Sequence, residues 1–242
     1  FVDTKDDSIG RGNTGSLSGC ALTSLFNNVY LHRVDLVYDK RCEKYFRYAR
    51  IEVVDIRPYA GGSFRHIDDD PYGGGVGMVM RCAPVLECLE DVISKCDPCE
   101  RRFVAVMSPA GYRYTQKTAH QFAALDHLIL ICGHYEGLDE RIIDRADGVF
   151  TIGDYVLTGG ELPARVVMDS VIRLLPGVLR REATVEESFE TELLEHPQYT
   201  KPAEYQGSRI PDVLLSGNHE LIRSWREKEA LRITRKRRPD LL

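Results

Sequence analysis

The sequence predicts an α/β domain with a largely parallel sheet, followed by a small, mostly helical C-terminal domain. From about residue 21 to residue 177, short apolar segments alternate with segments of helical periodicity. This alternation is typical of parallel strands joined by crossover helices. Beyond that stretch, basic residues gather near the C-terminus, where the apolar pattern indicates one long helix.

The expected strands are short and rich in β-branched, apolar and aromatic residues. They cover residues 20–26, 50–56, 103–107, 128–132 and 149–152. Between them, apolar residues recur with helical spacing over 83–95 and 118–125, so helices are expected there.

Another helix is expected directly after the stretch "IGDYVLTGGELPA" at 152–164. Thr158 and Glu161 have the spacing of a capping box, and Pro163 is tolerated in a first helical turn. The expected buried stripe consists of Val166, Val167, Val171, Leu174 and Leu175. The helix should end at Pro176-Gly177.

These segments suggest four parts of the chain. Residues 1–19 have the polar composition of a disordered tail, 20–177 form the main domain, 178–200 contain an acidic run typical of a linker or lid, and 201–242 form a small C-terminal domain. The last contains a helix from about Asn218. Its inward residues are expected to be Leu221, Ile222, Trp225 and Leu231.

Composition narrows the class of protein. At 242 residues and 43% apolar content, the chain can bury a large core. No apolar run approaches the roughly 20 residues of a membrane span, and residues 1–19 do not resemble a secretory signal. Seven cysteines, an odd number in a chain of this length, favour a reducing cytoplasm. Cys96 and Cys99 are spaced like zinc ligands but no second ligand pair accompanies them, so no metal site is predicted.

Charge is distributed unevenly along the chain. The net charge of −5 argues against indiscriminate coating of nucleic acid. The C-terminal helix nevertheless carries eight basic residues: Arg223, Arg226, Lys228, Arg232, Arg235, Lys236, Arg237 and Arg238. This cluster could hold phosphates, with a plain solvated helix as the alternative.

Three glycine-bearing loops stand out, at 68–78, 132–141 and 152–164. In the first, the third glycine of a dinucleotide fingerprint would fall on Met78 or Met80, and no lysine is present to contact a phosphate. This loop is therefore either a set of tight turns or a flexible cover over a ligand.

The other two loops each follow a predicted buried strand, where ligands bind in parallel α/β sheets. Exposed backbone suits the edge of a purine, and Tyr155, Val156 and Leu157 could cover its faces. Nearby Glu136, Asp139 and Asp154 favour a cationic ligand. S-adenosylmethionine, which combines adenine with a sulfonium, fits both loops, although such glycines can also serve only as turns.

Five motifs carry a resemblance to a known family: "PYGGGVGM", "CGHYEGLDER", "IGDYVLTGGELP", "HPQYTKP" and "VLLSGNHELIRSWR". In this order and spacing the chain, from about residue 51 to 242, resembles the bacterial tRNA (guanine-N1)-methyltransferases, which modify the guanosine 3′ of the anticodon. The resemblance implies a SPOUT fold with a deep trefoil knot, S-adenosylmethionine as methyl donor and a homodimer whose active sites lie across the interface. It also implies Mg²⁺ dependence, which the residues by themselves do not indicate.

The resemblance also assigns residues. The donor contacts would be Gly133, Ile152, Gly153, Asp154, Tyr155, Val156 and Leu157. Arg173 would stabilise charge on guanine O6, and Glu187 stands where the family has an aspartate as general base, with Glu186 as a rival. From the residues alone, Arg173 could instead pair with Asp169 on the helix surface, and Glu187 could belong to a solvated acidic run.

The chain departs from the family pattern at several positions. Val76, His134, Thr158 and Phe64 replace proline, arginine, serine and histidine respectively. Two other functions stay open from the sequence: a knotted RNA methyltransferase with another target base, and an RNA-binding homologue that has lost catalysis.

Overall fold

A computed structural model describes residues 30–35, 48–62, 65–180, 184 and 187–242. The predicted strand at 20–26, together with Phe64 and Glu186, lies outside these residues. The chain divides into two compact units between Val178 and Leu179, and each unit is described by itself. In the part of the chain described, no helix is both long and apolar enough to cross a membrane.

A five-stranded sheet forms the centre of the first unit. In spatial order its strands are β2 (Arg50–Asp55), β1 (Tyr30–Asp35), β6 (His127–Cys132), β5 (Arg102–Arg113) and β7 (Gly148–Thr151). As expected from the sequence, β6, β5 and β7 are parallel. Strand β1, which we did not predict, runs antiparallel to both β2 and β6.

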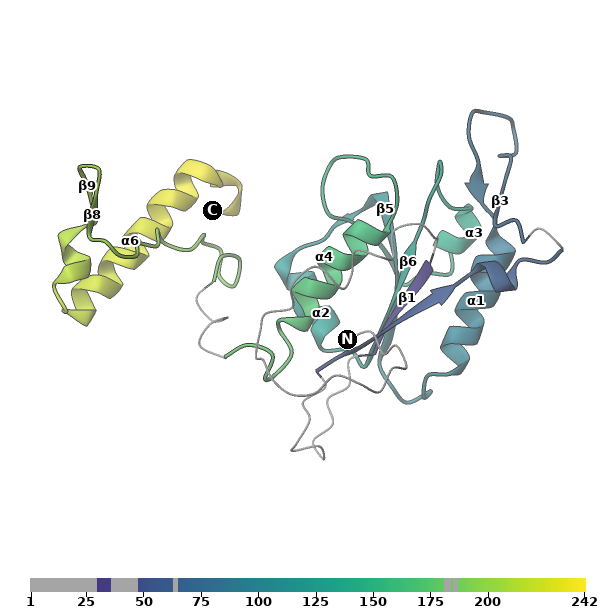
Figure 1. Ribbon diagram of the computed structural model, residues 1–242, viewed down its shortest axis with the longest axis horizontal. Helices are drawn as coiled ribbons and strands as arrows, with labels where there is room; N and C mark the ends of the chain where they lie inside the picture. Colours follow the sequence, from purple (N-terminus) through teal and green to yellow (C-terminus); the bar gives the residue numbers. More distant parts are fainter. Residues whose placement is uncertain (1–29, 36–47, 63–64, 181–183, 185–186) are drawn as a thin grey trace. The chain divides into compact units, whose positions relative to one another are not determined.

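Helices cover both faces of this sheet (Figure 1). On one face lie α1 (Cys82–Ser94) and α3 (Glu140–Ile143), and on the other lie α2 (Gln116–Ala123) and α4 (Glu161–Ile172). A short hairpin of β3 (Asp68–Asp69) and β4 (Val79–Met80) precedes α1, and a 3₁₀ turn η2 (Arg57–Tyr59) follows β2. The expected helices at 83–95 and 118–125 correspond to α1 and α2.

Strand β6 explains why two layers of helices are needed. All six of its residues are buried. Because successive side chains of a strand point to opposite faces, Ile129 and Ile131 pack in the core on the α1 side. Leu128, Leu130 and Cys132 pack on the α4 side. Burying each aliphatic side chain contributes roughly 1.5–3 kcal/mol, so this strand anchors both halves of the core.

Strand β5 is longer than the sequence predicted. It extends to Arg113, and its pairing with β7 shifts register between Met107 and Tyr112. At Gly111 a Cβ would overlap the backbone at Val149 and Phe150. The segment between the two registers therefore depends on glycine for a close backbone approach.

Helix α4 corrects three details of the prediction. The capping box does not form, because the helix is preceded by Gly160 as N-cap and has no side-chain cap. The helix ends at Ile172, before Pro176-Gly177. Val166, expected in the buried stripe, is 48% exposed, whereas Val167, Val171 and Leu175 are buried.

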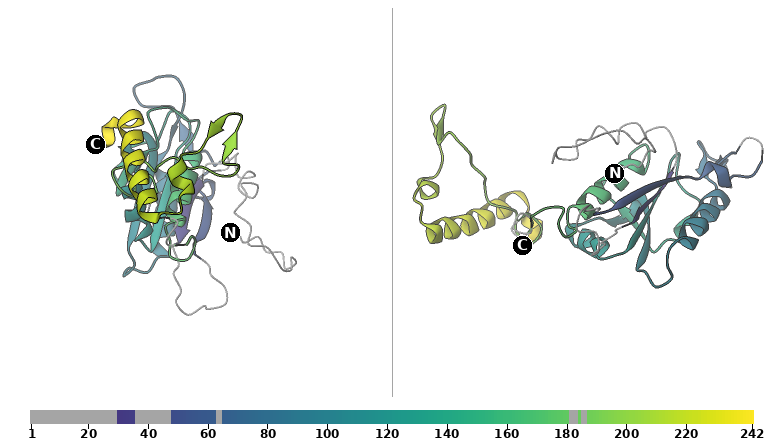
Figure 2. Two further views of the ribbon diagram at one scale, coloured as in Figure 1. Left: turned by 90° about the vertical axis from the view of Figure 1, so that its left-hand side faces the viewer. Right: turned by 60° about the horizontal axis from the view of Figure 1, so that its bottom comes forward.

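The second unit contains one long helix, α6 (His219–Arg237), preceded by a hairpin of β8 (Glu204–Tyr205) and β9 (Ser208–Arg209) (Figure 2). Two 3₁₀ turns, η3 (Asp212–Leu215) and η4 (Pro239–Leu241), flank the helix. The Asn218 side chain caps α6 by accepting hydrogen bonds from the amides of Glu220 and Leu221 at 3.1 and 3.2 Å. This confirms the predicted start.

The buried face of α6 differs in one place from the expected one. Leu221, predicted to point inward, is 55% exposed because it lies in the first turn, while Trp225 and Leu231 are partly buried. The most buried positions are Ile233 and Thr234, near the end of the helix.

The acidic segment before the hairpin packs against that end of α6. The Thr234 hydroxyl accepts a hydrogen bond from the Leu194 amide at 2.9 Å and donates one to the Ala230 carbonyl at 2.7 Å. The Arg238 guanidinium lies 5.7 Å from the centre of the Phe189 ring. Residues around Glu187, in the segment we expected to be a linker or lid, thus belong to the same compact unit as the helix.

Candidate active site

The candidate site lies at the carboxyl ends of the parallel strands β6, β5 and β7, where open α/β sheets bind ligands. Three segments meet this edge: 133–139 after β6, 108–111 near the end of β5, and 152–160 after β7. Two of them are the loops singled out in the sequence.

The segment after β6 is fastened to strand β4. The Glu136 amide donates to the Met78 carbonyl at 3.0 Å, the Met80 amide to the Gly137 carbonyl at 3.0 Å, and the Asp139 amide to the Met80 carbonyl at 3.1 Å. A parallel bridge also joins Met80 to Leu138. These bonds fix the backbone of the predicted donor residue Gly133 on its C-terminal side.

The glycine-rich segment 72–77, which leads into β4, has the geometry of tight turns. Gly73, Gly74, Gly75 and Gly77 all have positive φ angles, between 78° and 141°, which side chains rarely tolerate. Val76, one of the departures from the family, is 94% exposed, and Tyr72 is fully exposed. The turns are confirmed, and a covering role stays a prediction.

The loop after β7 presents its predicted donor residues near the surface. The Thr151 hydroxyl and the Tyr155 amide both donate to the Gly153 carbonyl, at 2.8 and 3.0 Å, and so close a tight turn. A Cβ at Gly153 would overlap the Tyr155 ring. Beyond the turn, Tyr155 is 55% exposed and Val156 83% exposed, while Ile152 and Leu157 are partly buried.

The two predicted donor loops are in direct contact. The Gly160 amide donates a hydrogen bond to the Gly133 carbonyl at 2.9 Å. A Cβ at position 160 would lie 2.7 Å from the Cys132 Cα and 3.0 Å from the Gly133 nitrogen. Only glycine permits this approach, which brings the segments after β6 and β7 together. Burial raises the pKa of the adjacent Cys132 thiol well above its usual value.

A side-chain contact joins the same two segments. His134 Nε2 lies 2.6 Å from Glu161 Oε1, and the side chains are 28% and 15% exposed. The Glu161 carboxylate thus faces a tertiary partner, while Gly160, and not Thr158, is the N-cap of the helix. Thr158, the other half of the predicted capping box, is exposed.

The site is less acidic than the sequence indicated. Asp154 is paired with Arg113 at 2.6 Å, and Asp139 with Arg141 at 2.7 Å. The Arg141 guanidinium, by hydrogen bonding, holds the pKa of Asp139 below its usual value. Of the three acidic residues proposed to attract a cation, only Glu136 is described without such an arginine partner, and its side chain lies against Gly77.

The two predicted catalytic residues fall in different units. Arg173 follows the last residue of α4, is partly buried, and its amide donates to the Asp169 carbonyl at 3.2 Å. Glu187 lies in the second unit, where its carbonyl accepts a hydrogen bond from the Glu190 amide at 3.2 Å. Their catalytic roles stay predictions.

Sequence reasoning missed two features of this edge. The segment 108–111 was overlooked because the predicted strand stopped at residue 107, although "SPAG" after an apolar strand is a turn signal that could have drawn attention to it. The contact between His134 and Glu161 has no local signal, because 27 positions separate the two residues. Within the described ranges, no group of three or more His, Cys, Asp or Glu side chains is placed to hold a metal ion.

The fold is that of an α/β domain with glycine-rich loops after parallel strands, at the sheet edge where such domains commonly bind ligands. The family model for tRNA (Guanine-1)-methyltransferase TrmD matches residues 21–242. Curated relatives described as tRNA (guanine-N(1)-)-methyltransferase are 53% identical over 195 residues in Listeria monocytogenes strain EGD-e and 52% identical over 195 residues in Bacillus subtilis strain 168. These alignments cover 79% and 80% of this chain, and 79% of each relative. A relative from Geobacillus kaustophilus is 54% identical over 194 residues, covering 79% of this chain and 78% of its own. The chain belongs to the tRNA (guanine-1)-methyltransferase family.

Proposed function

We propose that this chain is an enzyme that transfers a methyl group from S-adenosylmethionine to N1 of the guanosine 3′ of the anticodon in tRNA. Membership of the family over residues 21–242 supports the reaction. The observation that carries the site assignment is the contact of Gly160 with Cys132 and Gly133, which joins the two loops expected to bind the donor.

The residues present fit this donor. Glycine at positions 133, 153 and 160 leaves peptide groups uncovered by side chains, and Gly160 approaches the backbone of Cys132 and Gly133, so main-chain groups are available to an adenine edge. Tyr155 and Val156 provide exposed apolar surface for its faces. In this proposal Ile152, Asp154 and Leu157 complete the donor contacts, and the segment 108–111 adds a third wall because β5 lies between β6 and β7. The knotted threading of these loops belongs to the same proposal.

The donor supplies an electrophilic methyl group bound to a sulfonium. Guanine N1 carries a proton, and a general base must remove it before the N1 lone pair can form the new carbon–nitrogen bond. We assign proton removal to the Glu187 carboxylate. The Arg173 guanidinium then stabilises the negative charge that develops on O6, because its donors can face that oxygen. The methyl carbon–sulfur bond breaks as the N1–carbon bond forms.

Helix α6 supports a role in tRNA binding. A shallow groove on its surface is lined by Lys228, Leu231, Arg232, Arg235 and Lys236. Arg232 is paired with Glu229 at 2.6 Å, and Arg238 with Asp240 at 2.6 Å. In this proposal the basic side chains contact phosphates, which position an RNA without reading its sequence.

A homodimer is part of the proposal. On α4, Leu162 and Val166 stand one turn apart and are 44% and 48% exposed, which leaves an apolar strip on the solvent side of the helix. Covering this strip with a second copy would remove apolar surface from water. The described residues therefore offer a surface that a dimer would bury.

Methylation of two tRNA transcripts tests the function. The first carries guanosine after the anticodon and the second carries adenosine there. Methyl incorporation into the first alone supports the proposal. Incorporation into both would indicate another target base, and binding of both without incorporation would indicate an RNA-binding protein without this activity.

A further inference from the structure

The contact between His134 and Glu161 lies where the two donor loops meet. His134 is the second residue after β6, and Glu161 is the first residue of α4. His134 Nε2 and Glu161 Oε1 are 2.6 Å apart, and both side chains are largely shielded from water. A contact of this length between partly desolvated groups meets less competition from water than an exposed one.

Each partner is held by its own backbone. The His134 amide faces the Met80 sulfur at 3.3 Å, so the residue is fixed to strand β4. Glu161 lies in the first turn of α4, where the helix dipole favours a carboxylate. Because both residues are fixed to their own segments, the contact between their side chains restrains the distance between the segment after β6 and the start of α4.

The pair also limits the position of Gly159. A Cβ at position 159 would overlap Glu161 Oε2 and would lie 2.7 Å from His134 Nε2. The two side chains thus fill the space beside this glycine, and the end of the 152–160 loop lies against them. A backbone bond from Gly160 to Gly133 crosses the same junction.

We propose that His134 and Glu161 are a positioning pair that holds the two donor loops in the separation needed to bind the methyl donor. This inference rests on the proposed function, because it concerns the same site. The pair does not touch the reacting atoms in this proposal. Losing it should weaken donor binding and leave the chemical step nearly unchanged.

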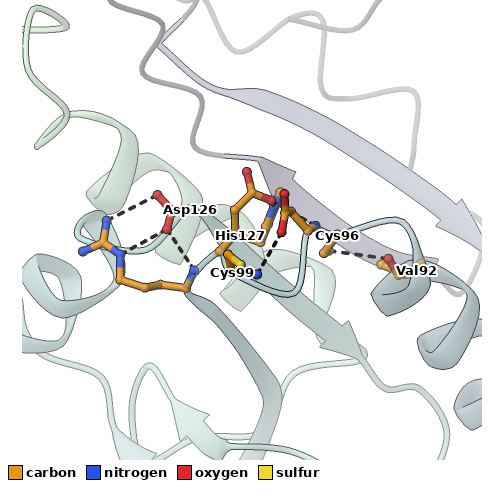
Figure 3. A network of polar contacts seen from close by, with 8 residues as sticks. Val92, Cys96, Cys99, Asp126 and His127 are labelled. Atoms are coloured by element: carbon orange, nitrogen blue, oxygen red, sulfur yellow. Dashed lines mark hydrogen bonds and ion pairs between the residues drawn. The ribbon is translucent and has the colours of Figure 1, made fainter.

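Strand β6 offers a matched control at its other end. His127, its first residue, lies with Nε2 2.5 Å from Glu100 Oε2. Figure 3 shows the polar network around His127, which includes Asp126 and the turn carrying Cys96 and Cys99. This second pair also consists of a histidine and a glutamate, but it lies at the end of β6 opposite the proposed donor loops. Breaking the contact between His127 and Glu100 should lower the stability of the fold without weakening binding of the methyl donor.

The test compares His134→Ala, Glu161→Ala, the double variant and Glu100→Ala in the full chain. Calorimetry gives the Kd for S-adenosylmethionine, and steady-state assays on tRNA give KM for the donor and kcat. Each single variant should raise the donor Kd and KM about tenfold, about 1.4 kcal/mol, with kcat at saturating donor within about twofold. The double variant should bind the donor no more weakly than the single variant with the higher Kd. Glu161→Gln, which keeps an acceptor oxygen, should recover most of the affinity, and Glu100→Ala should bind the donor normally.

The outcomes separate this inference from the proposed function. If the unmodified protein does not bind the donor, the proposed function fails and the inference fails with it. If the unmodified protein binds the donor and both single variants bind it as tightly as the unmodified protein, the inference alone is overturned. It is also overturned if the losses of affinity in the two single variants add in the double variant. A lowered kcat at unchanged KM would also overturn it. If Glu161→Ala does not fold, the donor Kd of His134→Ala is compared with that of His134→Gln, which keeps a polar side chain at this position.

Discussion

The Thr234 hydroxyl ties the acidic segment of the second unit to helix α6, accepting a hydrogen bond from the Leu194 amide at 2.9 Å. Thr234 has no exposed surface. Leu194, in the same segment as Glu187, is therefore anchored to a fully buried side chain of the helix.

Replacing that hydroxyl should destabilise the second unit. Thr234→Val keeps the shape of the side chain but leaves the Leu194 amide without its partner, which costs about 1–3 kcal/mol. Chemical denaturation should show the loss, and hydrogen exchange should show faster exchange at Leu194. Thr234→Ser, which retains the hydroxyl, should lose much less stability. Equal stability of the Val and Ser variants would contradict this prediction.

Gly160→Ala should disrupt the junction between the donor loops. The new Cβ would lie 2.7 Å from the Cys132 Cα, and backbone on both sides would have to shift. We expect a loss of about 1–3 kcal/mol in stability, as for other overpacked sites, together with weaker donor binding. Gly61→Ala is the control, because a Cβ at Gly61 would have no neighbour within 4 Å. If both variants bind the donor equally well, the close approach does not matter for binding.

Arg173→Ala and Glu187→Gln should each lower turnover far more than donor affinity. Both act on the transition state in the proposed mechanism, so kcat should fall about 100-fold or more while the donor Kd changes less than about twofold. Arg145→Ala removes an exposed arginine that lies 3.6 Å from Glu90, away from the proposed site, and should leave kcat unchanged. Parallel losses of donor binding and kcat would mean that the two roles are misassigned.

The contact between Arg101 and Asp126 should make stability depend on pH in acid (Figure 3). Hydrogen bonding from the Arg101 guanidinium, at 3.1 Å, holds the pKa of Asp126 below its usual value. A depressed pKa means that this stabilisation is complete above the unfolded value of about 3.9 and is lost as pH falls through the folded value. Asp126→Asn should therefore be less stable than the unmodified protein near neutrality, and the difference should shrink below about pH 4.

Urea unfolding between pH 2.5 and pH 7 measures this difference. Arg101→Gln removes the guanidinium but keeps the Arg101 amide, which donates to Asp126 at 2.9 Å, so it should show a smaller pH-dependent deficit than Asp126→Asn. The magnitude should be small, because the pair is solvent-accessible on both sides. A deficit that stays constant with pH would show that the contact does not act through the charge of Asp126.

The basic surface of α6 should control the salt dependence of tRNA binding. The double variant Arg235→Ala, Lys236→Ala removes two side chains that line the groove on α6. If each contacts one phosphate, the slope of log affinity against log salt should fall by about two, with no change in donor affinity. Lys117→Ala, an exposed lysine on α2, should not alter the slope. An unchanged slope in the double variant would place the RNA elsewhere.

The sequence was most informative where one local pattern decides the structure. The run of apolar residues at 128–132 predicted strand β6, because burial on both faces requires it. Asn218 predicted the start of α6, because its side chain caps the adjacent amides. Where tertiary partners compete, local patterns were misleading. Glu161 was expected to cap its own helix, but His134 provides a closer partner from a segment far along the chain. The antiparallel strand β1 was missed because "YLHRVD" mixes polar and apolar residues without a strong strand pattern.

The candidate site was predictable only in part. The glycines at 133, 153 and 160 marked loops that do meet, and the close backbone approach at Gly160 is the contact that requires glycine. The charge balance was visible only in part: Arg141 stands two positions after its partner Asp139, whereas Arg113 is 41 positions from its partner Asp154. Arg173 and Glu187 were assigned through the family resemblance, and neither has a distinctive local pattern.

The buried thiol of Cys132 has a practical consequence for chemical probes. It sits immediately before the donor loop, yet burial suppresses the thiolate on which alkylation depends. Cys99, by contrast, is exposed but belongs to the turn at the other end of β6. Alkylating reagents should therefore label the exposed Cys99 faster than Cys132, so modification of Cys132 cannot serve as a probe of the proposed donor site in the folded protein.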